Sequence, residues 1–172
     1  MDRPASIAQL PAPRLATAQP AHLGWRVLAL LYDFFPMLAL WFAASLAVYL
    51  LRGKVTVRPD SLAAYSELLL LWLLTGAYAV ISWRRGGQTI GMRPWRLKVV
   101  ALDGRPASWR ALCLRYAIAT VSTLAFGLGL WWTLLARERR GWHDLAAGTR
   151  FVRLDRPPPG PPSSEPPPDA GS

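Results

Sequence analysis

Cysteine, histidine and acidic side chains are scarce in this chain of 172 residues. The single cysteine, Cys113, excludes an internal disulfide, and one cysteine with two histidines argues against a structural zinc site. Lys and Arg number 20 against 10 Asp and Glu, which gives a formal net charge of +10. A basic chain can bind nucleic acid, but here the arginines lie beside apolar runs, where anionic lipid headgroups are the simpler counter-ion. We therefore expect a lipid bilayer as a partner and no nucleic acid.

Long apolar runs are the main feature that is present. Hydrophobic residues make up 52% of the chain, and apolar spans joined by basic loops explain this together with the charge of +10 better than a soluble core does. The runs predict helices over about 24–51, 62–83 and 109–136, and about 20 residues suffice to span a bilayer. The length corresponds to one domain. The sequence therefore predicts an all-α integral membrane protein.

Both ends of the chain differ from this membrane domain. Residues 1–22 carry four prolines and no apolar run, and residues 155–172 are rich in proline, so we expect two disordered tails around a domain at 23–154. Within the domain, residues 97–102 are β-branched enough for a strand and are followed by an Asp-Gly turn signal. We predict that they pair with residues 149–154 in a small cytoplasmic β element.

One aspartate interrupts the first apolar run. A charge at the centre of a membrane helix costs about 2.5–3.5 kcal/mol on insertion scales, so Asp33 is the first candidate for a special role. Arg26 shares its helix face but lies about 10.5 Å away along the axis, and helical side chains lean toward the N-terminus, so these two residues are not expected to pair. We predict instead that Asp33 pairs with Arg115 of the third run. Arg26 then extends to the headgroups or meets Asp144 at the surface.

Two interpretations of these charges remain open. In the first, Asp33 exchanges a proton or a cation, as a carboxylate inside a membrane protein can. In the second, Asp33, Arg115 and Asp144 hold the segments together and specify their arrangement. The structural interpretation is favoured, because two spans alone cannot enclose a pathway. Transport would therefore require a homo-oligomer or a membrane protein partner.

The basic residues also bear on how often the chain crosses the membrane. Three full crossings would divide them 11 to 9, whereas a third run that returns to its starting side divides them 17 to 3. The second division agrees with the positive-inside rule. We therefore predict two full spans plus a bent, re-entrant or tilted third segment that turns near Gly127–Gly129. The N-terminus and the loop at 84–110 are then cytoplasmic.

Three motifs in order carry a family resemblance. The first is W-R-V-L-A-L-L-Y-D, with Arg26 and Asp33 seven residues apart. The second is G-Q-T-I-G, a loop motif whose polar and glycine positions are Gly87, Gln88, Thr89 and Gly91. The third is H-D-L-A-A-G-T, which contains Asp144. Together they resemble the RDD family of small bacterial membrane proteins, named for one arginine and two aspartates.

The resemblance covers about residues 23–154 and implies a multi-pass protein of the bacterial inner membrane. It also implies that Arg26, Asp33 and Asp144 are the family's charged residues. Family members often have a lysine after G-x-x-x-G, where this chain has Met92 followed by Arg93, so a role of that lysine does not transfer. The family's role is mostly unassigned, and cation–proton exchange has been proposed for some members.

An enzymatic role is the least favoured class. His143 and Asp144 are adjacent, and adjacent helical residues point about 100° apart, so the carboxylate does not orient the imidazole. No nucleophile, metal-ligand set or phosphate-binding loop accompanies them. We therefore predict no catalytic residue, no metal and no cofactor. The expected role is a structural, accessory or assembly subunit, and the alternative is a minimal cation/proton antiporter or small-solute transporter acting as an oligomer.

Overall fold

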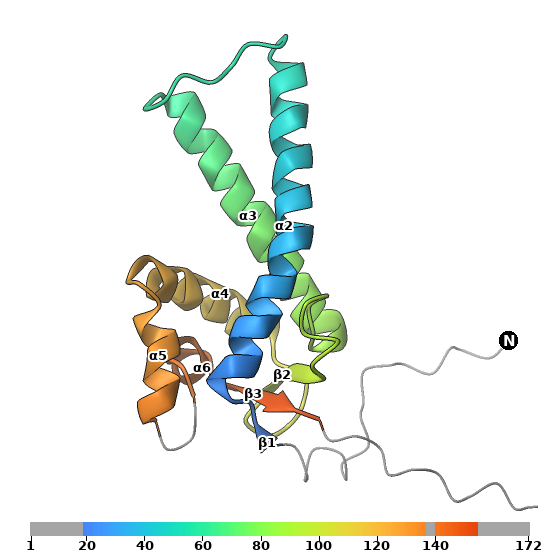
Figure 1. Cartoon of the computed structure of the whole chain (residues 1–172), viewed down its shortest axis with the longest axis vertical. Coiled ribbons are helices and arrows are strands. Elements are labelled where there is room, and N and C mark those ends of the chain that lie inside the picture. The colour runs from blue at the N-terminus through green and yellow to red at the C-terminus, as the bar shows by residue number, and fades with distance from the viewer. Residues whose placement is uncertain (1–18, 137–139, 155–172) are drawn as a thin grey trace, which may run out of the picture.

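Two long helices dominate the computed structural model, which describes residues 19–136 and 140–154 (Figure 1). Helix α2 spans Leu23–Leu51, and helix α3 spans Leu62–Gly86. The hydroxyl of Ser61 accepts a hydrogen bond from Ala64 N at the start of α3, and Gly87 ends it with a φ of 72°. Both helices are long and apolar enough to cross a membrane. The two helices expected to span a membrane are therefore present as candidate spans, the second about three residues longer than predicted.

The helices α2 and α3 form a hairpin that opens toward its connecting loop (Figure 1). Near the middle of the hairpin, Trp41 Nε1 donates to Thr75 Oγ1 over 2.8 Å. Large apolar side chains such as Phe35 and Phe42 are exposed around α2, and the same holds for α3. A helix that is apolar on all sides and not covered by protein suits a lipid environment. Pro36 lies inside α2, where buried membrane helices tolerate it.

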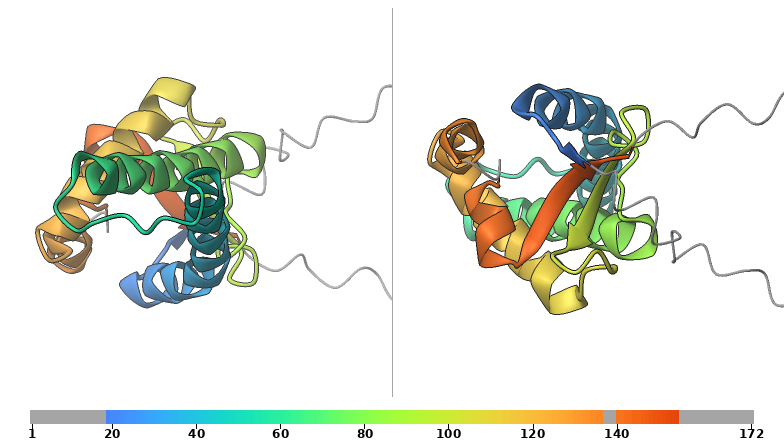
Figure 2. Two further views of the ribbon diagram at one scale, coloured as in Figure 1. Left: turned by 90° about the horizontal axis from the view of Figure 1, so that it is seen from above. Right: turned by 90° about the horizontal axis from the view of Figure 1, so that it is seen from below.

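A three-stranded antiparallel sheet lies at the other end of the hairpin. It contains β1 (Gln19–Pro20), β2 (Leu97–Ala101) and β3 (Thr149–Arg153) in the order β1-β3-β2. In the register of β2 and β3, Val99 lies opposite Phe151, which confirms the predicted pairing of 97–102 with 149–154. Seen from below, β2 and β3 lie side by side with the helices around them (Figure 2).

Strand β1 was not predicted from the sequence. Gln19 and Pro20, assigned there to the N-terminal tail, pair with Arg153 and Val152 of β3, and Ala21 N donates to the backbone oxygen of β3 residue Phe151. The strand forms because β3 offers an open edge to the residues that precede α2. The remaining tail residues, 1–18 and 155–172, lie outside the described residues.

The third apolar run forms two helices instead of the single helix expected over 109–136. Helix α4 spans Trp109–Leu124 and helix α5 spans Leu128–Leu135. Phe126 and Gly127 both have positive φ values, 53° and 72°, and reverse the chain between the helices. The short helix α6, Trp142–Ala146, then leads into β3. The run is therefore bent as expected, at a turn that includes Gly127.

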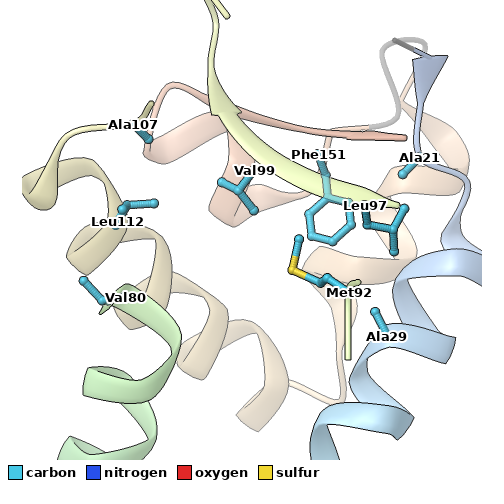
Figure 3. Close-up of a cluster of buried hydrophobic side chains, with 9 residues drawn as sticks. All are labelled: Ala21, Ala29, Val80, Met92, Leu97, Val99, Ala107, Leu112 and Phe151. Carbon is cyan, nitrogen blue, oxygen red and sulfur yellow. The ribbon is translucent and has the colours of Figure 1, made fainter. Parts of the chain in front are cut away.

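The apolar core lies between the sheet and the adjoining ends of the helices. Leu97, Val99 and Phe151 point from the strands toward Met92, with Ala29 of α2 nearby (Figure 3). Full burial of a Leu, Val or Phe side chain contributes about 1.5–3 kcal/mol, so this cluster is a main source of stability at this end of the hairpin. It fixes the sheet, and with it α6, against the hairpin.

Candidate functional site

Asp144 connects three helices through its carboxylate. It lies in α6 with an exposure of 0%, and Arg26 Nη1 from α2 donates to its Oδ2 over 2.6 Å. Arg115 Nη1 from α4 donates to Oδ1, and the backbone N–H of Gly141 donates to Oδ2 over 3.0 Å. The two arginines are 3% and 2% exposed. We call Arg26, Arg115 and Asp144 the Asp144 cluster.

Strand β3 supplies further contacts to both arginines. Arg115 Nη1 donates to Thr149 Oγ1 over 2.7 Å. The guanidinium carbons of Arg26 and Arg115 lie 4.8 Å and 5.6 Å from the ring centre of Phe151, and that of Arg115 also lies 5.3 Å from the Trp83 ring. Cation–π contacts of this kind strengthen when water is excluded. The Asp144 cluster therefore ties α2, α4 and α6 to the sheet and to the end of α3.

The charge state of the cluster follows from its surroundings. Burial alone would raise the pKa of Asp144, but the positive charges of Arg115 and Arg26 outweigh it and hold the pKa below its usual range. Burial, assisted by Arg115, lowers the pKa of the neighbouring His143 to about 4. At neutral pH the carboxylate is therefore ionised, and the imidazole is neutral.

Asp33 has a different environment. It is 4% exposed and accepts from Tyr78 Oη over 2.8 Å, from Gly91 N over 2.9 Å and from the Thr89 hydroxyl. All three donors are neutral, and within residues 19–136 and 140–154 no Lys, Arg or His forms an ion pair with Asp33. We call these four residues the Asp33 site. It joins the two long helices to the loop after α3.

The G-Q-T-I-G motif is shaped to reach this site. A Cβ atom on Gly91 would lie 2.4 Å from Ala29 O and 2.6 Å from Asp33 N, so only glycine permits this approach. Gln88 Nε2 donates to Leu97 O over 2.7 Å, which holds the loop to β2. Met92, at the position after the motif, is buried in the core. The motif thus holds α2 and the sheet together, because it contacts both.

The structure does not confirm the pairing of Asp33 with Arg115 that we predicted from the sequence. Asp33 does not pair with Arg115, because Arg115 binds Asp144 and Thr149 while the G-Q-T-I-G loop occupies both carboxylate oxygens of Asp33. Arg26 does meet Asp144, although the pair is buried and not at the surface. Sequence reasoning placed Thr149 at the start of a strand and Tyr78 in the second apolar run, but identified neither as a partner of the charged residues. For Tyr78 the available signal was a hydroxyl in an apolar segment, which does not identify its partner.

Comparison with known proteins places this arrangement in a family. No curated protein and no solved structure matches the chain. The model of the RDD family matches residues 20–148. This range contains both sites and runs from β1 to the end of α6. The chain therefore belongs to the RDD family.

Proposed function

We propose that this membrane protein is a structural, accessory or assembly subunit without enzymatic activity of its own. The observation that carries the proposal is the Asp144 cluster, in which all three charged groups are buried and both guanidinium groups bind the Asp144 carboxylate. A catalytic or transporting group must reach its substrate, whereas these groups contact helices and strands. Their chemistry is suited to fixing the positions of α2, α4 and α6, as buried ion pairs can do.

The strand pairing supports a topology with two crossings. Strands β2 and β3 are hydrogen-bonded, so they lie on the same side of the membrane, and the residues between them cross it an even number of times. Helix α5 has 8 residues and is about 12 Å long, too short for a hydrocarbon layer of about 30 Å. The segment α4–α5 is therefore re-entrant. The basic residues favour the cytoplasmic side of a bacterial inner membrane for the sheet, the loop at 84–110 and both termini.

Cysteine labelling from one side of the membrane tests this topology. In a Cys113→Ser background, Arg105→Cys reports the sheet end and Lys54→Cys reports the α2–α3 connection, and both positions are exposed. A cysteine added after Ser172 should label together with Arg105→Cys and opposite to Lys54→Cys. Labelling of the added cysteine on the side of Lys54→Cys would refute the topology.

A subunit role predicts a specific association within the membrane, with a membrane protein partner or a second copy. Crosslinking in intact membranes should give one discrete product with the wild type. The product should be lost with Asp144→Asn, which disturbs the arrangement of the helices, and retained with Asp103→Asn, which removes an exposed charge at the β2 turn. Crosslinking that is equally strong for both variants would show that the association does not depend on the Asp144 cluster, and would contradict the proposal.

Cation or proton exchange is the second candidate, and the Asp33 site favours it. Among the described residues, Asp33 is the buried acid whose hydrogen-bond donors are all neutral and which forms no ion pair with a cationic side chain. A proton or a cation can therefore balance the negative charge of its carboxylate. Exchange predicts that reconstituted protein dissipates a pH gradient on addition of Na⁺ or K⁺. Asp33→Asn should abolish the flux, and Asp103→Asn should not. Absence of flux from the folded wild type would exclude this candidate.

A further inference from the structure

The turn between α4 and α5 exposes a group of large apolar side chains. Leu124 is 78% exposed and Phe126 is 92% exposed, and Leu128 and Trp131 are also exposed. Phe126 has a φ of 53°, in the left-handed region that is unfavourable for a bulky residue. A turn in water would favour glycine or asparagine at this position. An exposed phenylalanine here fits an apolar environment. We call residues 124–131 the elbow.

Contacts between α4 and α3 fix the depth that α4 reaches before the elbow begins. Tyr116 Oη donates to Trp72 O over 2.8 Å, and Trp72 Nε1 donates to Thr120 Oγ1 over 3.1 Å. A Cβ on Gly76 would lie 2.7 Å from the Tyr116 ring, so α4 and α3 are closely packed here. Trp72 is about 17 Å along the helix axis from Trp83, the last residue of α3 before the basic pair Arg84 and Arg85, at 1.5 Å per residue. Since the hydrocarbon layer is about 30 Å thick, α4 reaches about half its depth.

We propose that α4 and α5 form a wedge that inserts among the acyl chains of one leaflet only and makes the protein respond to membrane curvature. This inference rests on the proposed re-entrant topology. Helix α5 runs back toward the sheet end (Figure 1), so the leaflet on that side contains α2, α3, α4 and α5, and the far leaflet contains α2 and α3. Two helices of 10–12 Å diameter add about 160–230 Å² of cross-section to one leaflet.

This asymmetry has a direct consequence for orientation. A convex leaflet accommodates a wider inclusion than a concave one, and insertion into a single leaflet is sensitive to curvature. In a small vesicle the outer leaflet is strongly convex. The protein should therefore place its sheet end outward in small vesicles, and this preference should fade as the vesicles become larger.

The test uses orientation in vesicles of different size. Full-length protein carrying Cys113→Ser and either Arg105→Cys or Lys54→Cys is reconstituted by detergent removal into phosphatidylcholine vesicles of about 30 nm or about 200 nm diameter, the range over which curvature changes strongly. The zwitterionic lipid removes the attraction of the basic sheet end to anionic headgroups. An impermeant maleimide then labels the outward-facing sites.

The expected result is a shift in both reporters. Labelling of Arg105→Cys should rise in the small vesicles, and labelling of Lys54→Cys should fall by the same amount. Labelling that does not depend on vesicle diameter overturns the wedge while leaving the topology intact. If labelling of the two single-cysteine proteins instead rises and falls together, the two sites lie on the same side and the proposed topology itself fails.

Matched substitutions locate the effect within the chain. Leu124→Ala with Phe126→Gly reduces the volume of the elbow and should weaken the dependence on diameter. Phe42→Ala with Leu46→Ala removes exposed apolar groups from the far half of α2, and should preserve or strengthen the dependence. An equal weakening by both pairs would show that the elbow is not the origin, and would overturn the proposal. The wild-type reporters need no change in the elbow, so the primary test does not depend on how these variants fold.

Discussion

Replacement of Asp144 by asparagine is the most demanding test of the arrangement. The substitution keeps the shape of the side chain but removes the charge that lies between Arg26 and Arg115. Removing one partner of a buried ion pair costs about 3–5 kcal/mol, because the remaining charge is left in a poorly solvated place. Here two guanidinium groups lose their carboxylate and repel each other. We therefore expect Asp144→Asn to lie at or above the upper end of this range.

Thermal unfolding in detergent, followed by tryptophan fluorescence, measures this loss. For a protein of this size each kcal/mol lowers the midpoint by about 2–4 °C, so a loss of about 5 kcal/mol or more should make the variant unfold at least about 10–20 °C below the wild type. Asp103→Asn is the matched control, since Asp103 pairs with Arg105 at 3.2 Å and both side chains are more than half exposed. An exposed pair contributes at most about 1 kcal/mol.

A double-mutant cycle separates the ion pair from general damage. Arg26→Gln should be costly in the wild type and much less costly beside Asp144→Asn, because Arg26 has then already lost its charged partner. The coupling energy for groups in contact is about 0.5–3 kcal/mol. Additive effects, or an Asp144→Asn midpoint equal to that of Asp103→Asn, would refute the assignment of the cluster as the connection between α2, α4 and α6.

Three further predictions concern the groups around the two sites. Folding lowers the pKa of His143 from 6.5 to about 4, so the unfolded chain binds a proton at a higher pH than the folded protein does. The free energy of unfolding should therefore fall by about 2 kcal/mol from pH 7 to pH 5. His143→Gln should remove this pH dependence, and an unchanged dependence would assign it to other groups. Gly91→Ala places a Cβ 2.4 Å from a backbone oxygen of α2 and should lower the midpoint clearly, whereas Gly86→Ala, which meets nothing within 4 Å, should not; equal midpoints would contradict the close approach. Thr89→Val removes a donor to Asp33 and should lower the free energy of unfolding by about 1–3 kcal/mol. Thr89→Ser keeps the hydroxyl and should retain most of the wild-type stability; an equal loss in both variants would show that the hydrogen bond is not the cause.

The sequence was sufficient for the elements whose signals are local. Apolar runs of spanning length identified α2 and α3, and a β-branched run before an Asp-Gly turn identified β2. The resemblance to the RDD family also singled out Arg26, Asp33 and Asp144, all of which are buried in the structure. The helices and the strand follow from hydropathy and periodicity along the chain, which do not depend on how segments meet.

Pairing between segments was not accessible in the same way. Asp33 and Arg115 were matched because they lie at comparable depth, but depth leaves the rotation of each helix undetermined. The direction of Arg115 is set by Thr149 of β3, which follows it by many residues and forms a hydrogen bond with it. Strand β1 has only two residues and no pattern of its own, so it is stabilised by β3 and not by its own sequence.

The two family aspartates therefore differ in how they should respond to the same substitution. In Asp33→Asn, the amide oxygen can still accept from Tyr78 and Gly91, and the Thr89 hydroxyl can turn to accept from the new amide N–H. In Asp144→Asn, a new N–H faces a guanidinium group that has no acceptor to offer, whichever way the amide turns. A scaffold role thus predicts a mild Asp33→Asn phenotype and a severe Asp144→Asn phenotype in both stability and activity. Exchange at Asp33 predicts a stable Asp33→Asn protein that is nevertheless inactive, so stability and flux measured on this one variant distinguish the two functions.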